Sequence, residues 1–170
     1  MPFQIDDRVV YPACGVGRIA ALVTKRFFEA EARQYYEVTI EKSTVWVPVD
    51  AGTTSGLRLL TSKEELARYR GVLRSRPVPL TLDPRQRRLD LLSQLRAGSL
   101  QNLCEIVRDL TARSWRKVLG EADKAALRRA RDGLCQEWAA VDGVSVVQAT
   151  EEVDALLREG RQAYQALALG

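Results

Sequence analysis

The sequence contains no histidine and only three cysteines, and both shortages limit the chemistry that the chain can perform. Without histidine there is no Ser-His-Asp or Cys-His nucleophile, no ordinary general base for neutral pH and few of the usual zinc sites. The cysteines, Cys14, Cys104 and Cys135, are odd in number and none has the C-x-x-C spacing. We therefore expect idle thiols in a reducing cytoplasm, with no bound metal and no cofactor.

Organised catalytic motifs are missing as well. The sequence has no G-x-x-x-x-G-K-[ST], G-x-S-x-G or H-E-x-x-H pattern. Gly15-Val-Gly17 is too short for a phosphate-binding loop, because a third glycine, a lysine and a following helix are all absent. We interpret it as a β-turn that needs positive φ. We expect no catalytic residues and a protein that is not an enzyme.

Long apolar runs are absent too. A run such as Ile19–Val23 falls far short of the ~20 residues that a membrane span needs. The first residues have neither the basic nor the apolar segment of a signal peptide. We expect a cytoplasmic protein that makes no contact with a membrane.

Positive charge is concentrated in the middle of the chain. The net charge of the 170 residues is +4, but residues 62–117 alone carry 13 basic and six acidic side chains. Residues 1–61 are neutral overall and residues 118–170 are net acidic. A basic segment beside an acidic one favours an oriented contact with a polyanion.

Residues 1–60 have the pattern of a small β-domain. Short β-rich runs at residues 8–12 and 18–24 precede two further runs, Tyr35–Ile40 and Thr44–Val49, that flank a three-residue connection with hairpin spacing. Pro48 has no backbone N–H, so we expect its strand to lie at a sheet edge or to end there. We predict a small antiparallel β-domain over residues 1–60.

The pattern becomes helical after Leu60. Signals for the starts and ends of helices occur at Ser62 with Glu65, Asp83-Pro84, Gly98-Ser99 and Asp142-Gly143. Apolar residues at helical spacing predict five helices, the third with a stripe that extends to Val118. The expected fold class is α+β, in which the antiparallel β-domain is followed by an all-α domain of about five helices over residues 61–170.

Three aromatic residues, Tyr35, Tyr36 and Trp46, lie across the predicted hairpin. Aromatic residues on a small sheet can build its core, and they can also contact a partner. For Trp46 both interpretations remain open. An edge strand at this place can recruit a strand of another protein through its unpaired backbone groups.

Two groups of basic residues are candidates for contact with nucleic acid. Arg85, Arg87 and Arg88 occupy the first turns of the predicted second helix, where cations oppose the helix dipole and therefore do not serve helix stability. Lys124, Arg128 and Arg131 are spaced i, i+4, i+7 on the predicted fourth helix, so they share one face. Arginine suits phosphate contact. The alternative is a solvated face for the first group, and local pairing with Glu121 and Asp132 for the second.

The chain resembles the CarD/CdnL-like transcription regulators of bacteria over about residues 3–140. The residues that carry the resemblance are Ile5-Asp-Asp-Arg-Val-Val-Tyr-Pro12, Gly15-Val-Gly17, Tyr35-Tyr36, Val47-Pro-Val49, Gly56-Leu-Arg58, Ile106-Val-Arg-Asp-Leu110 and the stretch from Asp123-Lys124 to Ala130-Arg131. The resemblance implies a Tudor-like β-domain that binds the β subunit of RNA polymerase by adding its sheet edge to a strand of that subunit. It also implies a helical domain that contacts promoter DNA and stabilises the open complex.

The resemblance assigns candidate residues to each contact. Its implied polymerase contacts are Lys25, Arg26, Trp46, Val47 and Pro48. Trp46 stands where the family has a basic residue on the hairpin strand, and Pro84 stands near a tryptophan that many members use as a minor-groove wedge. We therefore expect phosphate contacts without a wedge, made by Arg85, Arg87, Arg88, Lys124, Arg128 and Arg131, in a monomer. The alternative function is a protein-interaction adaptor that makes no contact with DNA.

Overall fold

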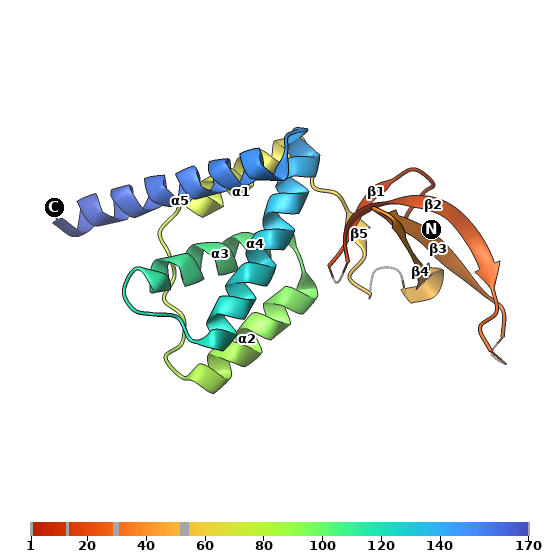
Figure 1. Cartoon of the computed structure of the whole chain (residues 1–170), viewed down its shortest axis with the longest axis horizontal. Coiled ribbons are helices and arrows are strands. Elements are labelled where there is room, and N and C mark those ends of the chain that lie inside the picture. Colours follow the sequence, from red (N-terminus) through yellow and green to blue (C-terminus); the bar gives the residue numbers. More distant parts are fainter. Residues whose placement is uncertain (1, 13, 29–30, 52–54, 170) are drawn as a thin grey trace. The chain divides into compact units, whose positions relative to one another are not determined.

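The computed structural model describes residues 2–12, 14–28, 31–51 and 55–169, with side chains described up to residue 165. The chain divides into two compact units, Met1–Leu60 and Thr61–Gly170. The first unit contains all the described strands and the second contains all the described α-helices (Figure 1). The expected α+β fold class, a β-unit followed by a unit of five helices, is confirmed.

The first unit is one antiparallel sheet of five strands in the order β4-β3-β2-β1-β5. The strands are β1 (Arg8–Tyr11), β2 (Gly15–Lys25), β3 (Arg33–Ile40), β4 (Ser43–Pro48) and β5 (Arg58–Leu59), with a short 3-10 helix η1 (Val49–Ala51) after β4. The core lies on one face of the sheet, where alternate residues such as Val9, Ile19, Val38 and Val47 are buried. Apolar burial of one face fixes the register of the strands.

Two turns differ from the sequence prediction. Gly15-Val-Gly17 is the start of β2 rather than the turn itself, which lies just before it, where the Cys14 amide donates to the Tyr11 carbonyl over 2.8 Å. The expected positive φ is nevertheless present at Gly15, where φ is 118°. Gly17 is needed for close packing, because a Cβ there would lie 2.5 Å from the carbonyl oxygen of Thr39. The β3–β4 hairpin closes at Ile40 and Ser43, so its loop is one residue shorter than predicted.

The second unit consists of five helices. They are α1 (Lys63–Arg74), α2 (Pro84–Ala97), α3 (Leu100–Ser114), α4 (Glu121–Asp142) and α5 (Val146–Leu169). The predicted caps form: the side chains of Ser62, Asp83 and Ser99 each accept a bond from a backbone amide of the following helix. Gly98 and Gly143 adopt the left-handed conformation that ends α2 and α4.

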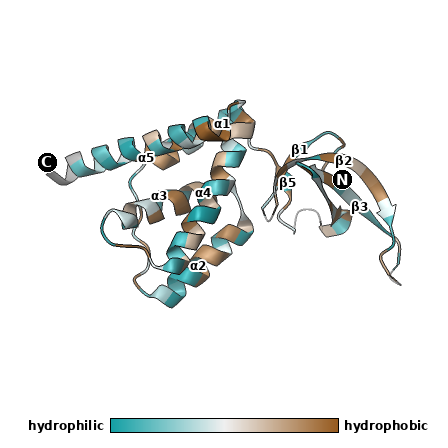
Figure 2. Ribbon diagram, in the orientation of Figure 1, coloured by the Kyte–Doolittle hydropathy of each residue, from teal (hydrophilic) through white to brown (hydrophobic). Residues whose placement is uncertain are grey.

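The core of the helical unit surrounds Trp138, whose side chain is fully buried together with Leu66, Leu110 and Leu134. The predicted extension of the third apolar stripe is wrong, because α3 ends at Ser114 and Val118 is 86% exposed. Each helix carries polar and apolar residues interleaved along its length (Figure 2). Within the described ranges, no helix combines the length and the apolar character needed to cross a membrane.

Candidate interaction surfaces

The first candidate surface is the outer edge of β4. This strand pairs only with β3, so its other edge ends the sheet. The opposite edge is formed by β5, which has two residues against the six of β4. The longer open edge of the sheet is therefore the one that contains Trp46.

The register of the hairpin shows which backbone groups of β4 face outward. A two-residue loop closes on a hydrogen-bonded pair, here Ile40 with Ser43, and hydrogen-bonded and non-bonded pairs alternate from that point. The backbone groups of Thr44, Trp46 and Pro48 therefore point away from β3. Proline has no N–H to donate, so Pro48 can offer only its carbonyl and does not weaken the β3–β4 ladder.

Trp46 lies on the face of the sheet opposite the core, in a cluster of aromatic and cationic side chains. Lys25 Nζ is 3.7 Å from the centroid of the Trp46 ring. The Phe27 ring packs edge-on against Tyr35 at 5.3 Å between centroids and lies 6.5 Å from Trp46. Trp46 remains 37% exposed and does not belong to the core, so contact with a partner stays as the prediction for this residue.

The other residues expected at this surface differ in how exposed they are. Val47 is 1% exposed and belongs to the core, so its side chain is not available to a partner. Pro48 is half-buried and Arg26 is exposed. Beside them, Arg33 and Asp50 form an exposed ion pair of 2.7 Å, and the hydrogen bond and charge of Asp50 raise the pKa of Arg33.

Sequence reasoning missed two phenylalanines at this end of the sheet. Phe27 is 40% exposed and Phe28 is 99% exposed, and Phe28 has a φ of 56°, which is rare for a bulky residue. Large exposed apolar side chains that gather beside an open strand are typical of an interaction site. The signal was present in the sequence, because Phe27-Phe28 directly follows the cations Lys25-Arg26.

The second candidate surface is the cationic start of α2. Arg85 and Arg88 are exposed there, as expected for contacts with phosphates. Arg87 is not available, because it is 7% exposed, pairs with Asp123 over 3.2 Å and donates to the Thr81 carbonyl over 3.0 Å. The expectation that Arg87 contacts DNA is therefore wrong: its guanidinium is committed inside the unit.

The expected cations of α4 are also divided between surface and interior. Arg128 is exposed, and Lys124 has only a 3.6 Å pair with Glu121, one turn away, which is weak at an exposed position. Arg131 pairs with Asp154 of α5 over 2.6 Å and is one-third exposed, so its charge is largely neutralised within the protein. Arg129, which the sequence reasoning left out of the candidate set, is exposed.

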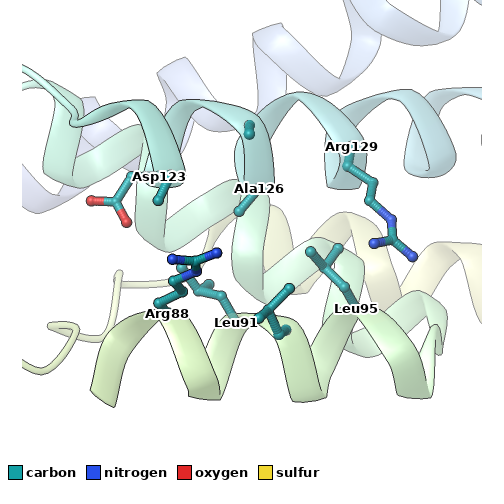
Figure 3. Close-up of a pocket in the computed structure, with 9 residues that line it drawn as sticks. Arg88, Leu91, Leu95, Asp123, Ala126 and Arg129 are labelled. Atoms are coloured by element: carbon teal, nitrogen blue, oxygen red, sulfur yellow. The ribbon is translucent and has the colours of Figure 1, made fainter. Parts of the chain in front are cut away.

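An apolar groove of about 200 Å³ separates α2 from α4. Its lining includes Leu91, Leu95 and Ala126, and the guanidinium groups of Arg88 and Arg129 lie toward opposite ends of it (Figure 3). The groove can accept an apolar side chain, and the two arginines favour anionic groups on either side of that chain.

The buried thiols have no feature of reactive cysteines. Burial raises the pKa of the Cys104 thiol to about 12, and burial also raises the pKa of Cys135. Cys14 is exposed. Among the described residues, no group of three or more Cys, Asp or Glu side chains is arranged to hold a metal ion.

Comparison with known proteins matches both units to described domains. Residues 3–58 match the CarD-like/TRCF RID domain, and residues 70–154 match the CarD C-terminal domain. The chain is also 30% identical over 148 residues to the Bacillus subtilis (strain 168) protein named "Putative transcription factor YdeB". That similarity covers 86% of this chain and 96% of the relative.

Proposed function

The chain belongs to the CarD-like family of transcription regulators, and we propose that it binds the β subunit of RNA polymerase and contacts promoter DNA. The β-unit makes the first contact by strand addition at β4. The helical unit makes the second contact through its exposed arginines, which stabilises the open promoter complex. The protein acts as a monomer in the cytoplasm. The observation that carries this proposal is the open edge of β4.

Strand addition needs backbone groups that are free and evenly spaced. Thr44 and Trp46 offer an N–H and a carbonyl each, and Pro48 offers a carbonyl, so a partner strand can form several hydrogen bonds with this edge. Each such bond contributes about 0.5–1.5 kcal/mol net. Trp46, Phe27 and Lys25 lie on the outer face next to the edge and add side-chain selectivity to backbone pairing.

The test is a substitution that removes one outward N–H and leaves the sheet intact. Thr44→Pro removes the N–H that a partner strand would accept from, and proline is tolerated at an edge where the N–H faces solvent. We expect the affinity of the full chain for the polymerase β subunit, measured by biolayer interferometry, to fall at least about tenfold, the equivalent of ~1.4 kcal/mol.

Thr44→Val is the matched control, because it changes the same side chain and keeps the N–H. We expect Thr44→Val to bind the β subunit as the native chain does. Equal binding by Thr44→Pro and Thr44→Val, with both proteins folded by circular dichroism, would exclude strand addition at β4.

The DNA contact rests on the exposed cations of α2 and α4. Arg85 and Arg88 lie at the start of α2, and Lys124 and Arg128 follow on α4. These residues supply charge without a scaffold for reading bases, so they suit phosphate contacts. Binding to free duplex DNA should accordingly be weak, salt-sensitive and independent of sequence.

Each weak contact strengthens the other because the two units belong to one chain. Leu60 donates its amide to the Arg8 carbonyl within the first unit, and the Thr61 hydroxyl donates to buried Glu137 over 2.6 Å within the second. Adjacent residues of the chain are therefore anchored in different units. Polymerase binding then raises the effective concentration of the helical unit near the promoter.

A second candidate function is a protein-interaction adaptor, and the groove between α2 and α4 favours it. An acidic segment with a central apolar residue would fit between Arg88 and Arg129. Charge reversal, Arg85→Glu with Arg88→Glu, separates the two functions. DNA contact predicts unchanged polymerase binding with a weakened promoter footprint, whereas the adaptor predicts an unchanged footprint.

A further inference from the structure

A third group of cations lies where α5 passes the ends of α1 and α3, and here the cations stack on aromatic rings. The guanidinium of Arg161 is 4.7 Å from the centroid of the Trp115 ring. The guanidinium of Arg76 is 5.2 Å from the centroid of the Tyr164 ring, and Arg116 donates to the Tyr164 hydroxyl over 3.0 Å. We call these five residues the α5 surface.

The backbone fixes the position of this surface. Gly160 is buried where α5 crosses the end of α1, and a Cβ at Gly160 would lie 2.8 Å from the carbonyl oxygen of Arg74. The absence of a side chain thus lets α5 approach the point at which Arg76 follows α1. Arg161 and Tyr164, one and four residues after Gly160, are thereby held beside Arg76.

The positive charge of the α5 surface is not neutralised by its neighbours. Arg76, Arg116 and Arg161 are exposed, and none of them forms an ion pair with a described residue. The nearby carboxylates are used elsewhere: Glu159 pairs with Arg74 over 3.8 Å, and Asp109 pairs with Arg108 over 2.8 Å. Exposed Lys117 adds a further cation next to Arg116.

The stacking selects between the ligands that a basic surface can hold. An arginine occupies one face of the Trp115 ring and one face of the Tyr164 ring, which leaves less of each ring for stacking with bases. A guanidinium group that stacks on a ring uses its flat face for that contact. Its N–H donors point outward in its own plane, so they can still form bidentate hydrogen bonds to oxyanions. The chemistry therefore favours the phosphates of duplex DNA over single-stranded bases.

We propose that the α5 surface is a second phosphate-binding site, which contacts the backbone of the same duplex as the cations of α2 and α4. This inference rests on the proposed function and extends the DNA contact to α5, whose last turns lie beyond the matched region that ends at residue 154.

The path of the chain connects the two basic surfaces. The α1–α2 connection begins beside Arg76 and ends just before Arg85. The α3–α4 connection begins beside Arg116 and leads into the first turn of α4, which contains Lys124. Both connections run along the same side of the helical unit (Figure 1). A duplex that follows this side can therefore meet both groups of cations.

The salt dependence of DNA binding tests the inference. Fluorescence anisotropy of a labelled 40-base-pair duplex, titrated with the full chain at several KCl concentrations, gives the slope of log K against log salt. Substitution of all three arginines, Arg76→Gln, Arg116→Gln and Arg161→Gln, should reduce the size of this slope by about 0.9 for each phosphate that the variant no longer neutralises. Arg96→Gln, at the far end of α2, is the control and should leave the slope unchanged.

A second triple variant separates this inference from the proposed function. Arg85→Gln with Arg88→Gln and Arg128→Gln removes the cations of α2 and α4. A reduced slope in both triples supports both sites. An unchanged slope in the α5 triple alone overturns the inference and leaves the proposed function standing, whereas an unchanged slope in the second triple alone overturns the assignment to α2 and α4.

Two further readouts exclude trivial results. If the α5 triple loses affinity for the polymerase β subunit and keeps its affinity for DNA, the surface is a protein contact and the inference fails. If the α5 triple does not fold, Arg116→Gln with Lys117→Gln replaces it, because Lys117 is exposed and packs on no aromatic ring of a described residue. This pair should reduce the slope by about 1.8, and no reduction would again overturn the inference.

Discussion

The β-unit and the helical unit expose different kinds of recognition group. At β4 the groups are backbone amides and carbonyls, which every edge strand has regardless of its sequence. On the helices they are arginines, and an arginine can turn inward to a carboxylate, as Arg87 and Arg131 do. The topology of the sheet therefore determines the first surface, whereas the second depends on which carboxylates the fold brings close to each cation.

The largest expected effect tests whether the buried ion pair of Arg87 stabilises the helical unit. Asp123 is 6% exposed and pairs with Arg87, and it has a second, longer pair with Arg113 at 3.7 Å. Arg87→Ala leaves this buried carboxylate with the longer pair alone, so we expect a loss of about 3 kcal/mol in the free energy of unfolding, measured with urea. The control Arg88→Ala, an exposed neighbour, should change stability by less than about 0.5 kcal/mol. Equal stability losses would contradict the division between interior and surface arginines.

The next effect compares one glycine from each unit. Gly17→Ala brings a Cβ to 2.5 Å from the Thr39 carbonyl oxygen, so β2 and β3 must separate and stability should fall by about 2 kcal/mol. The Cβ that Gly71→Ala adds inside α1 has no heavy atom within 4 Å, so it causes no clash. Because alanine favours the helix more than glycine does, the free energy of unfolding should rise by about 0.5–1 kcal/mol. Thermal unfolding of the two full-length variants measures both. A stable Gly17→Ala protein would show that the two strands can part without cost.

The third effect tests whether side chains add selectivity at the edge. Trp46→Ala removes the ring on which the Lys25 ammonium group stacks. We expect it to weaken binding to the polymerase β subunit about five- to tenfold, the equivalent of ~1–1.4 kcal/mol. Leu59→Ala removes an exposed apolar side chain from the opposite edge, β5, and should leave the affinity unchanged. If both variants bind as the native chain does, the backbone alone carries the contact.

The smallest effect concerns the thiols. Burial holds the pKa of Cys104 at about 12, far above its ordinary value, so its thiol stays protonated as the pH rises from 7 to 9. A thiol reagent should therefore label only exposed Cys14 in the native protein at both pH values, because Cys104 is buried and protonated. Rapid native labelling of Cys104 would show that α3 opens readily.

Much of the fold was readable from local signals, because caps and alternation act over a few residues. Ser62, Asp83, Ser99 and Gly143 carry out the predicted roles at the ends of helices. Gly17 was wrongly predicted to be part of a turn. A glycine is needed there because β3 packs closely against it, and residues 33–40 of β3 are remote from Gly17 in the sequence.

The candidate surfaces were readable only in part, for the same reason. Pro48 correctly indicated an edge strand, and Arg85, Arg88 and Arg128 proved exposed. Arg87 could not be separated from its neighbours, since its partner Asp123 is 36 residues away. The α5 surface depends on contacts between helices that are remote in sequence, such as the 48-residue separation of Arg116 and Tyr164.

The most direct measurement of the central claim is the lifetime of the open promoter complex at saturating protein. Two variants are compared with the native chain: Thr44→Pro, and Arg85→Gln combined with Arg88→Gln and Arg128→Gln. We predict that both shorten the lifetime, and that only Thr44→Pro loses affinity for polymerase. A native lifetime for the arginine triple, or an equal loss of polymerase affinity in both variants, would contradict the division of labour between the two units.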